Sequence, residues 1–211
     1  MKYDLAIIDY NMGNLFGLEC ALNHVKLKTV ITSDKDIIQN SKAIILPGVG
    51  SFGKAMKNIK EKKLDKIIKQ CNDEKKIIIG VCLGMQLLFQ KSSENNFNKG
   101  LSILKGSVVP INNKKKYLNV GWAKNKCKNE KNSLEKLINK QETYFIHSYV
   151  AKPLDKNIIF AQSSFDNKVF CSAVKINNIV GFQFHPEKSG INGIKILKLL
   201  SKKIKNNENT I

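Results

Sequence analysis

The sequence predicts an α/β fold whose central sheet is mainly parallel, flanked by helices and extended by a region of antiparallel strands. In the first half of the chain, short apolar runs alternate with segments of helical periodicity, a pattern typical of parallel strands joined by crossover helices. From about Leu101 the helical segments become few, and strand-like runs follow one another between Asn, Asp, Gly and Pro residues. That change predicts additional, partly antiparallel sheet.

The first half supplies strands and helices in alternation. The expected strands are the apolar runs 3–8, 28–32, 42–47 and 75–80. The expected helices are 13–25, 53–71 and 84–90. The segment 53–71 is predicted as one amphipathic helix, because its apolar residues fall on or near a single face.

The second half supplies strand-like segments and a closing helix. The segments are 106–111, 143–150, 157–162, 169–176 and 178–184, and the helix is 191–204. A chain of 211 residues with no internal repeat and no long linker is expected to form a single domain, residues 1–204. The polar end, residues 205–211, is expected to be a disordered tail.

Composition argues against a secreted, membrane or metal-binding protein. No window approaches the roughly 18 consecutive apolar residues of a membrane span, and the N-terminus lacks the basic start of a signal peptide. We therefore expect a cytoplasmic protein without membrane contact. The cysteines form an odd set without a CxxC pair, which fits neither a disulfide framework nor a zinc site, so no metal is expected. From their surroundings, Cys20 and Cys171 are expected to be buried, and Cys71 and Cys127 peripheral.

The net charge of +19 invites comparison with nucleic-acid-binding proteins. However, all 36 basic residues are Lys, whereas Arg makes the bidentate contacts with phosphate and guanine that such surfaces favour. The lysines are also spread along the chain beside many Asn and Ile residues, which indicates a composition bias rather than a binding patch. We expect no nucleic-acid partner, although a basic surface would suit an acidic protein.

Cys82 lies where a strand is expected to meet a helix, within Gly80-Val81-Cys82-Leu83-Gly84. This is the G-x-nucleophile-x-G arrangement of a nucleophile elbow, with sulfur in place of a hydroxyl. Glycines on both sides let the strand and the helix approach, and a helix N-terminus favours the reactive thiolate. The segment alone fits a buried cysteine in a tight turn equally well.

One of the three histidines also follows a strand end. His185 comes after the segment 178–184, and Glu187 follows two residues later, on the same side if the backbone is extended. The carboxylate can then fix the imidazole tautomer and leave the other nitrogen for the Cys82 thiol. Alone, His-Pro-Glu also fits a surface turn. His24 lies on the first helix, away from any turn.

Acyl transfer also needs N–H donors for an oxyanion. The N–H of Leu83, next to the expected nucleophile, is one candidate. The stretch Leu46–Phe52 after the third strand is a second, since its two glycines let the backbone approach a ligand. By itself this stretch also fits an ordinary glycine turn.

The stretches "GVCLGMQLLF", "PGVGSF", "YFIHSYV" and "GFQFHPEKSG" together resemble class I glutamine amidotransferases, and among them the glutaminase subunits of imidazole glycerol phosphate synthases. The resemblance includes the opening "IIDYNMGNL" and covers nearly the whole chain. It implies the three-layer fold of that family and hydrolysis of glutamine to glutamate and ammonia, without a cofactor. Met85 favours this subfamily, because amidotransferases of anthranilate and nucleotide synthesis usually have His there.

By position, the resemblance implies roles for individual residues. Cys82 is expected to attack the glutamine amide, His185 to transfer the proton and Glu187 to orient the imidazole. The residues implied for the oxyanion hole are Val49, Gly50 and Leu83, and those implied for glutamine binding are Gln86, His147, Ser148 and Tyr149. For His147, a role as a hydrogen-bonded residue at a strand end is about equally favoured.

The resemblance also implies a partner. In that family, ammonia passes to a (β/α)8-barrel cyclase, which makes imidazole glycerol phosphate and aminoimidazole carboxamide ribotide in histidine biosynthesis. Such a barrel typically takes about 250 residues, so a separate subunit and a heterodimer are expected. Trp122 and Lys188 match interface positions, although a locally packed Trp and a solvated Lys also fit.

Three departures from the family pattern lie near the expected docking face. Asn11 stands where Gly is usual, Ala123 where Asn is usual, and residues 162–170 lack a Tyr-Gly pair. They leave open a paralogous glutaminase that supplies ammonia to another acceptor, such as a surface sugar. A partner-independent cysteine hydrolase and a basic binding protein with a vestigial site are also compatible with the sequence.

Overall fold

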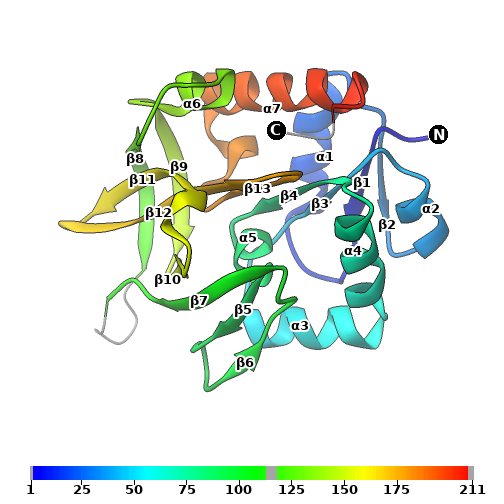
Figure 1. Ribbon diagram of the computed structural model, residues 1–211, viewed down its shortest axis with the longest axis horizontal. Coiled ribbons are helices and arrows are strands. Elements are labelled where there is room, and N and C mark those ends of the chain that lie inside the picture. Colours follow the sequence, from blue (N-terminus) through cyan, green and yellow to red (C-terminus); the bar gives the residue numbers. More distant parts are fainter. Residues whose placement is uncertain (1, 113–117, 209–211) are drawn as a thin grey trace.

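The protein is described by a computed structural model that covers residues 2–112 and 118–208. Within these residues the strands form a nine-stranded sheet in the order β2-β1-β3-β4-β13-β12-β11-β8-β9 and a four-stranded sheet in the order β10-β7-β5-β6. Figure 1 shows helices on both faces of the larger sheet. The expected α/β fold is confirmed.

The larger sheet has a parallel half and an antiparallel half. The parallel strands are β2 (Thr29–Thr32), β1 (Leu5–Ile8), β3 (Ala43–Leu46), β4 (Ile77–Val81) and β13 (Ile179–Phe182). The antiparallel strands that continue from β13 are β12 (Lys168–Ile176), β11 (Ile159–Phe165), β8 (Asn119–Cys127) and β9 (Glu142–His147). The two halves therefore meet at β13, which lies beside β4.

The smaller sheet is joined to the larger one through Ser148, because β9 of the larger sheet ends at His147 and β10 of the smaller sheet begins at Tyr149. Its strands are β10 (Tyr149–Pro153), β7 (Leu104–Pro110), β5 (Phe89–Ser92) and β6 (Asn98–Lys99). The segment 143–150, expected as one strand, is two strands in different sheets with a bend at Ser148. The N–H of Ile111, just after β7, donates to the Ser148 carbonyl at 2.9 Å and ties the bend to the smaller sheet.

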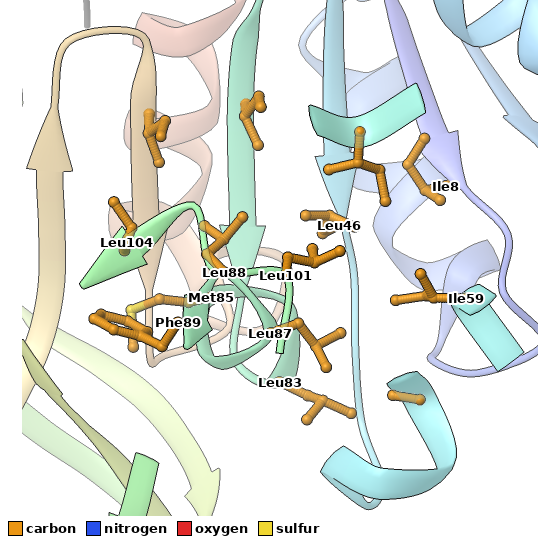
Figure 2. Packing of buried hydrophobic residues seen from close by; sticks show 14 of the residues in the cluster. Ile8, Leu46, Ile59, Leu83, Met85, Leu87, Leu88, Phe89, Leu101 and Leu104 are labelled. Atoms are coloured by element: carbon orange, nitrogen blue, oxygen red, sulfur yellow. The ribbon is translucent and has the colours of Figure 1, made fainter. Parts of the chain in front are cut away.

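The helices divide between the two faces of the larger sheet. One apolar cluster includes residues of α1 (Leu15–His24), α6 (Ser133–Ile138) and α7 (Gly190–Lys205). The other includes residues of α2 (Lys35–Gln39), α3 (Phe52–Glu61), α4 (Leu64–Asp73) and α5 (Leu83–Leu87), several of which Figure 2 shows. In β1, Leu5 and Ile7 belong to the first cluster, and Ala6 and Ile8 to the second. Because both faces are covered there, the inner parallel strands β1, β3, β4 and β13 are buried throughout, whereas the edge strand β2 begins and ends with Thr and is only partly buried.

The segment 53–71 is two helices, α3 and α4, so the prediction of one helix was wrong. Lys63, between them, has a left-handed φ of 55°. The apolar residues Ile59 and Leu64 are five positions apart, which breaks the spacing of three and four that keeps side chains on one face. The turn at Lys63 restores the phase, so that both helices direct apolar residues into the core.

Two cysteine predictions were also wrong. Cys71 is buried, because it lies one turn after Ile67 and Ile68 on the apolar face of α4. Cys20 is exposed, between the buried residues of α1. Cys171 is buried as predicted, and Cys127 is partly exposed.

The polar sequences of α2, α6 and β8 were not recognised as regular structure. For α6 a signal was present, because Asn132 and Glu135 form a capping box.

Of the expected tail, residues 209–211 lie outside the described residues. Among the described residues of this segment, Lys205 is the last residue of α7. The N–H of Glu208 donates to the Lys203 carbonyl at 3.1 Å, so the chain stays bonded to the helix end as far as Glu208. No described helix is long and apolar enough to cross a membrane.

The helix α5 packs against β3 and β4 without room for a side chain between them. A Cβ on Gly84 would lie 1.8 Å from the Leu46 carbonyl oxygen, and a Cβ on Gly80 would lie 2.6 Å from the Met85 Cα. The expected close approach of strand and helix around Cys82 is therefore confirmed.

Gly84→Ala is expected to destabilise the fold by at least about 2 kcal/mol, because the added methyl group must displace backbone atoms of β3. Urea denaturation followed by circular dichroism measures this loss. Gly53→Ala in α3 is the control, since its Cβ would meet the movable side chain of Asn98 at 2.8 Å. Equal losses in the two variants would contradict the prediction.

Candidate active site

Cys82 stands at the junction of β4 and α5 in a backbone conformation that few residues adopt. Its φ is 52° and its ψ is −108°, and such a conformation typically costs about 1–3 kcal/mol in a non-glycine residue. The N–H of Cys82 donates to the carbonyl oxygen of Phe182 in β13 at 2.7 Å. The N–H of Gln86 donates to the Cys82 carbonyl at 3.2 Å and begins the helix. The turn is therefore held from both sides.

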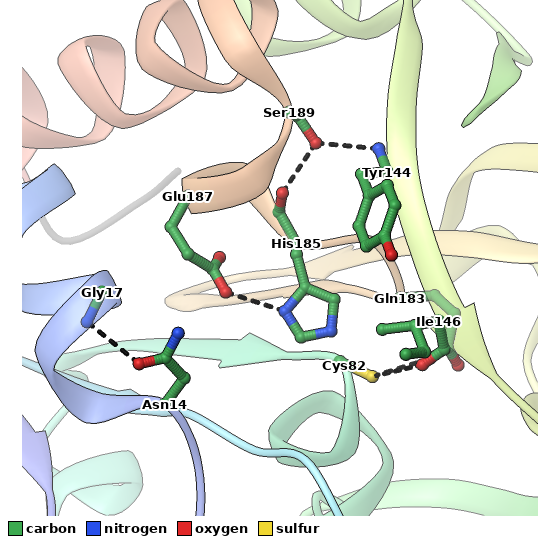
Figure 3. Close-up of polar contacts among 9 residues, drawn as sticks. All are labelled: Asn14, Gly17, Cys82, Tyr144, Ile146, Gln183, His185, Glu187 and Ser189. Carbon is green, nitrogen blue, oxygen red and sulfur yellow. Dashed lines mark hydrogen bonds and ion pairs between the residues drawn. The ribbon is translucent and has the colours of Figure 1, made fainter. Parts of the chain in front are cut away.

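His185 reaches the same site from β13. Phe182 pairs with Val81 in register, so the residues that follow β13 and β4 leave the sheet at one edge. The N–H of His185 donates to the Tyr144 carbonyl at 2.9 Å. The Ser189 hydroxyl donates to the His185 carbonyl at 2.7 Å and accepts from the Tyr144 N–H at 3.0 Å (Figure 3). Ser189, which no sequence pattern singled out, thus fixes the backbone of His185.

The imidazole of His185 is in direct contact with the carboxylate of Glu187. Nδ1 lies 2.8 Å from Oε1, and the two side chains are 2% and 6% exposed. The expected contact forms, but the expected reason was wrong. His185 precedes the 3-10 turn η2 (Pro186–Lys188), and this turn, rather than an extended backbone, brings the carboxylate onto the ring.

The second ring nitrogen of His185, Nε2, is buried and has no hydrogen-bond partner among the described residues. Figure 3 shows it on the side of the ring that faces the Cys82 sulfur. Burial lowers the pKa of His185, but contacts with the Cys82 sulfur and the Glu187 carboxylate outweigh burial and raise the pKa above its usual value. A protonated imidazole is therefore favoured beside the sulfur, where it can stabilise a thiolate and deliver a proton.

The loop after β3 packs on the start of α5. A Cβ on Gly48 would lie 2.7 Å from the Tyr10 hydroxyl and 2.8 Å from the Leu83 Cβ. The Tyr10 hydroxyl donates to the Pro47 carbonyl, and burial raises the pKa of Tyr10 well above its ordinary value. Gly50 has a φ of 118°, a conformation that favours glycine. The expected oxyanion-hole segment therefore lies directly against the nucleophile turn.

A pocket of about 270 Å³ opens beside Cys82, at the small end of sites for small molecules. Its lining includes these predicted site residues: Val49, Gly50, Cys82, Leu83, Gln86, His147, Ser148 and Tyr149. It also includes residues that were not predicted: Glu94, Leu118 and Ile146. His185 and Glu187 line a smaller neighbouring cavity with Gly48 and Val49. Within the described residues, no group of three or more His, Cys, Asp or Glu side chains is placed to hold a metal ion.

Two buried glutamines connect the sulfur with the pocket wall. The Gln86 Nε2 donates to the Tyr149 carbonyl at 2.8 Å and to the Gln183 Oε1 at 2.9 Å. The Gln183 Nε2 lies 3.6 Å from the Cys82 Sγ. Gln183 was missed in the sequence, although a Gln within the apolar run 178–184 was a signal, because a buried amide needs partners.

His147 is a buried, neutral residue at the end of β9. Its Nδ1 lies 3.1 Å from the Tyr149 carbonyl oxygen, to which it donates, and its Nε2 accepts from the Asn119 side-chain amide at 3.0 Å. Burial lowers the pKa of His147 to about 4. Both nitrogens are thus engaged within the protein, as expected of a structural residue at a strand end.

Trp122 and Lys188 are both exposed. Trp122, on β8, is 54% exposed and contacts Tyr144 edge-on with ring centroids 6.0 Å apart. Lys188 is the last residue of η2, next to Glu187. Further exposed apolar side chains are Phe16, Val49, Leu118, Val120 and Ile191. Because Val49 and Leu118 also line the pocket, apolar surface adjoins the pocket mouth.

The chain matches the family model described as "Glutamine amidotransferase class-I" over residues 6–201. The chain belongs to this family. As a class I glutamine amidotransferase, it also has curated relatives over nearly its full length. "Imidazole glycerol phosphate synthase subunit HisH" of Aquifex aeolicus is 38% identical over 93% of this chain and 95% of the relative. The protein of the same name from Bacillus subtilis is 38% identical over 94% of this chain and 95% of the relative.

Solved structures share the fold of this amidotransferase at lower identity. PurLQS from Thermotoga maritima has a TM-score of 0.73 at 20% identity, covering 98% of this chain and 99% of that chain. The glutaminase domain of Trypanosoma brucei CTPS with bound acivicin has a TM-score of 0.70 at 15% identity, covering 98% and 95%. These similarities support the fold alone.

The buried His147 of the amidotransferase is expected to make the fold sensitive to acid. The unfolded chain binds a proton there near pH 6.5, but the folded protein binds it only near pH 4, so stability falls as pH falls between these values. The expected loss is more than about 2 kcal/mol by about pH 4.5. Urea denaturation of the wild type and His147→Gln, near neutral pH and near pH 4.5, should show this loss in the difference between the two proteins. The same difference at both pH values would contradict the prediction.

Proposed function

We propose that this amidotransferase hydrolyses glutamine to glutamate and ammonia as the glutaminase subunit of an imidazole glycerol phosphate synthase in histidine biosynthesis. The observation that carries the chemistry is the strained Cys82, with the unpaired Nε2 of His185 facing it and Glu187 on the far side of the ring. The synthase assignment is supported by the names of relatives that are 38–40% identical over most of the chain. The activity is assigned to the cytoplasm.

In the first half of the proposed reaction, the Cys82 thiolate attacks the side-chain amide carbon of glutamine. The amide oxygen becomes an oxyanion, for which we assign the N–H groups of Leu83 and Val49 as donors, with Gly50 leaving space for the approach. The protonated His185 transfers its proton to the amide nitrogen. Ammonia then leaves, and a thioester on Cys82 remains.

In the second half, water hydrolyses the thioester. The neutral imidazole of His185 takes a proton from the water, which attacks the carbonyl carbon, and Cys82 leaves as a thiolate. Glu187 accepts the Nδ1–H throughout, so Nε2 is the nitrogen that exchanges the proton. Glutamate departs, and the imidazolium–thiolate pair is restored.

Glutamine is assigned to the pocket beside Cys82. The amide hydrogens of Gln86 are directed to Tyr149 and Gln183, so its carbonyl oxygen is the group left to accept a hydrogen bond from the glutamine ammonium. Ser148 and Tyr149 line the same pocket. His147 is assigned to the wall, holding Tyr149 in place, because both its nitrogens are already bonded.

The ammonia acceptor is assigned to a separate (β/α)8-barrel cyclase that forms a heterodimer with this chain. The docking surface is assigned to the apolar side chains at the pocket mouth, Val49 and Leu118, together with the exposed Trp122 and Lys188. The Trp122 ring lies next to Gly190, just after η2. The net charge of +19 suits an acidic partner surface. Docking at the mouth would close the pocket and keep ammonia from solvent.

Cys82→Ala is expected to lower glutamate release by at least about a thousandfold, because the thioester can no longer form. The measurement is glutamate formation in the presence of the cyclase, and binding of the cyclase should be unchanged. Cys20→Ala, which removes an exposed thiol, is the control. Retained turnover in Cys82→Ala would refute the nucleophile assignment.

The acceptor is tested by mixing the purified chain with the cognate histidine-pathway cyclase and measuring imidazole glycerol phosphate. Formation of this product, with glutaminase activity that rises on complex formation, is the expected result. Intact glutaminase without the product would instead favour another acceptor, such as a sugar. Full turnover without any partner would favour an independent hydrolase.

Trp122→Ser is expected to weaken cyclase binding by about tenfold or more, because central aromatic residues contribute most to such interfaces. Isothermal titration calorimetry measures the change. Val169→Ser is the control, since Val169 is 68% exposed on β12 and does not line the pocket. Equal affinities of the two variants would place the interface elsewhere.

A further inference from the structure

Gln183 is a buried polar residue that the proposed reaction does not use. Its side chain is 0% exposed, and its N–H donates to the Ser172 carbonyl at 2.8 Å, which continues the pairing of β13 with β12. A fully buried amide is stable only when its polar atoms have partners. The partners of Gln183 are the Cys82 sulfur and the Gln86 amide, so it joins the nucleophile to the pocket wall.

The orientation of both amides follows from one backbone carbonyl. The Tyr149 oxygen can only accept, so the Gln86 atom 2.8 Å from it must be Nε2. The same nitrogen lies 2.9 Å from the side chain of Gln183, which must therefore present its oxygen. Gln183 is then left with its Nε2 toward the Cys82 sulfur, at 3.6 Å. Reversing it would place two amide nitrogens together and an oxygen against the sulfur.

A thiolate at Cys82 would need a hydrogen-bond donor such as the Gln183 Nε2–H. Besides Gln183, the Ile146 carbonyl oxygen lies 3.6 Å from the Sγ, as Figure 3 shows. That oxygen accepts the S–H of a neutral thiol, but it repels a thiolate, because both atoms then carry negative charge. The Gln183 Nε2–H, 3.6 Å from the Sγ, offsets this repulsion, because hydrogen bonds to charged groups are the stronger ones.

We infer that Gln183 is a positioning residue for the glutaminase reaction: its Nε2–H stabilises the Cys82 thiolate, and its Oε1 holds the Gln86 amide in the orientation that binds glutamine. This inference rests on the proposed function. The donor acts before the attack on the amide and again when the sulfur leaves the thioester. The same side chain fixes the nucleophile and the wall that positions the substrate.

The test is the pH dependence of alkylation of Cys82 by iodoacetamide in the purified chain. The peptide that contains Cys82 is followed by mass spectrometry, because Cys20 is exposed and also reacts. Gln183→Met keeps the length of the side chain and removes the donor. Its alkylation curve is expected to shift to higher pH by about one pH unit, so that the rate on the acidic limb of the curve falls about tenfold.

Ser172→Ala is the matched control. Ser172 is 0% exposed on β12, and its Oγ has no hydrogen-bond partner in the described part of the chain, so the change removes a buried hydroxyl without touching the sulfur. Its alkylation curve should coincide with that of the wild type. A folded Gln183→Met with a wild-type curve would overturn the inference.

Gln86→Leu provides a second variant if Gln183→Met does not fold. It leaves Gln183 in place but removes the amide that orients it, so a smaller shift in the same direction is expected. An unshifted curve for Gln86→Leu in that case would overturn the inference.

Kinetics with the cyclase present separate positioning from a general loss of folded enzyme. In Gln183→Met, KM for glutamine is expected to rise, because Gln86 loses the partner that orients it, and kcat is expected to fall. Partial unfolding would lower kcat alone. An unchanged KM would overturn the role toward Gln86. If the wild type releases no glutamate with the cyclase, the proposed function fails, but the alkylation curves still decide whether Gln183 is the thiolate donor.

Discussion

The candidate site depends on the hydrogen bond between the Cys82 N–H and the Phe182 carbonyl. It joins the carboxyl ends of β4 and β13 at 2.7 Å and holds Cys82 at a φ that a free chain would leave. His185 follows Phe182 by three residues, so the same bond lies at the start of the segment that carries His185. A strained thiol and its proton acceptor are therefore placed by one contact between adjacent parallel strands, at the edge where ligands bind in such sheets.

The antiparallel half of the sheet curves so that its last strand, β9, contacts the segment that follows β13. Three strands separate β13 from β9 in the sheet order. Nevertheless, the His185 N–H donates to the carbonyl of Tyr144 in β9, and Ser189 bonds to both residues. The curvature brings the bend around Ser148 to the pocket beside Cys82. Each half of the sheet thus supplies one side of the pocket.

Buried polar side chains give the pocket wall a single arrangement. His147 uses both nitrogens, and Gln86 and Gln183 are oriented by a chain of donors and acceptors that starts at the Tyr149 carbonyl. Reversing any one of these groups would leave buried polar atoms facing like partners, which is costly in a dry interior. The wall is therefore rigid, as a site must be to hold a small substrate against a nucleophile.

The sequence by itself determined most of the parallel half of the sheet, because its inner strands are buried on both faces and therefore apolar. It also determined the tight turn around Cys82, because Gly80 and Gly84 allow an approach that residues with a Cβ do not. Together with the family resemblance, it also indicated His185 and Glu187. Only the tertiary structure decided that a 3-10 turn joins these two and that Gln183 and Ser189 contact the site. Local periodicity reports which face of a segment is buried, whereas the partner of a buried polar group is set by how distant segments meet.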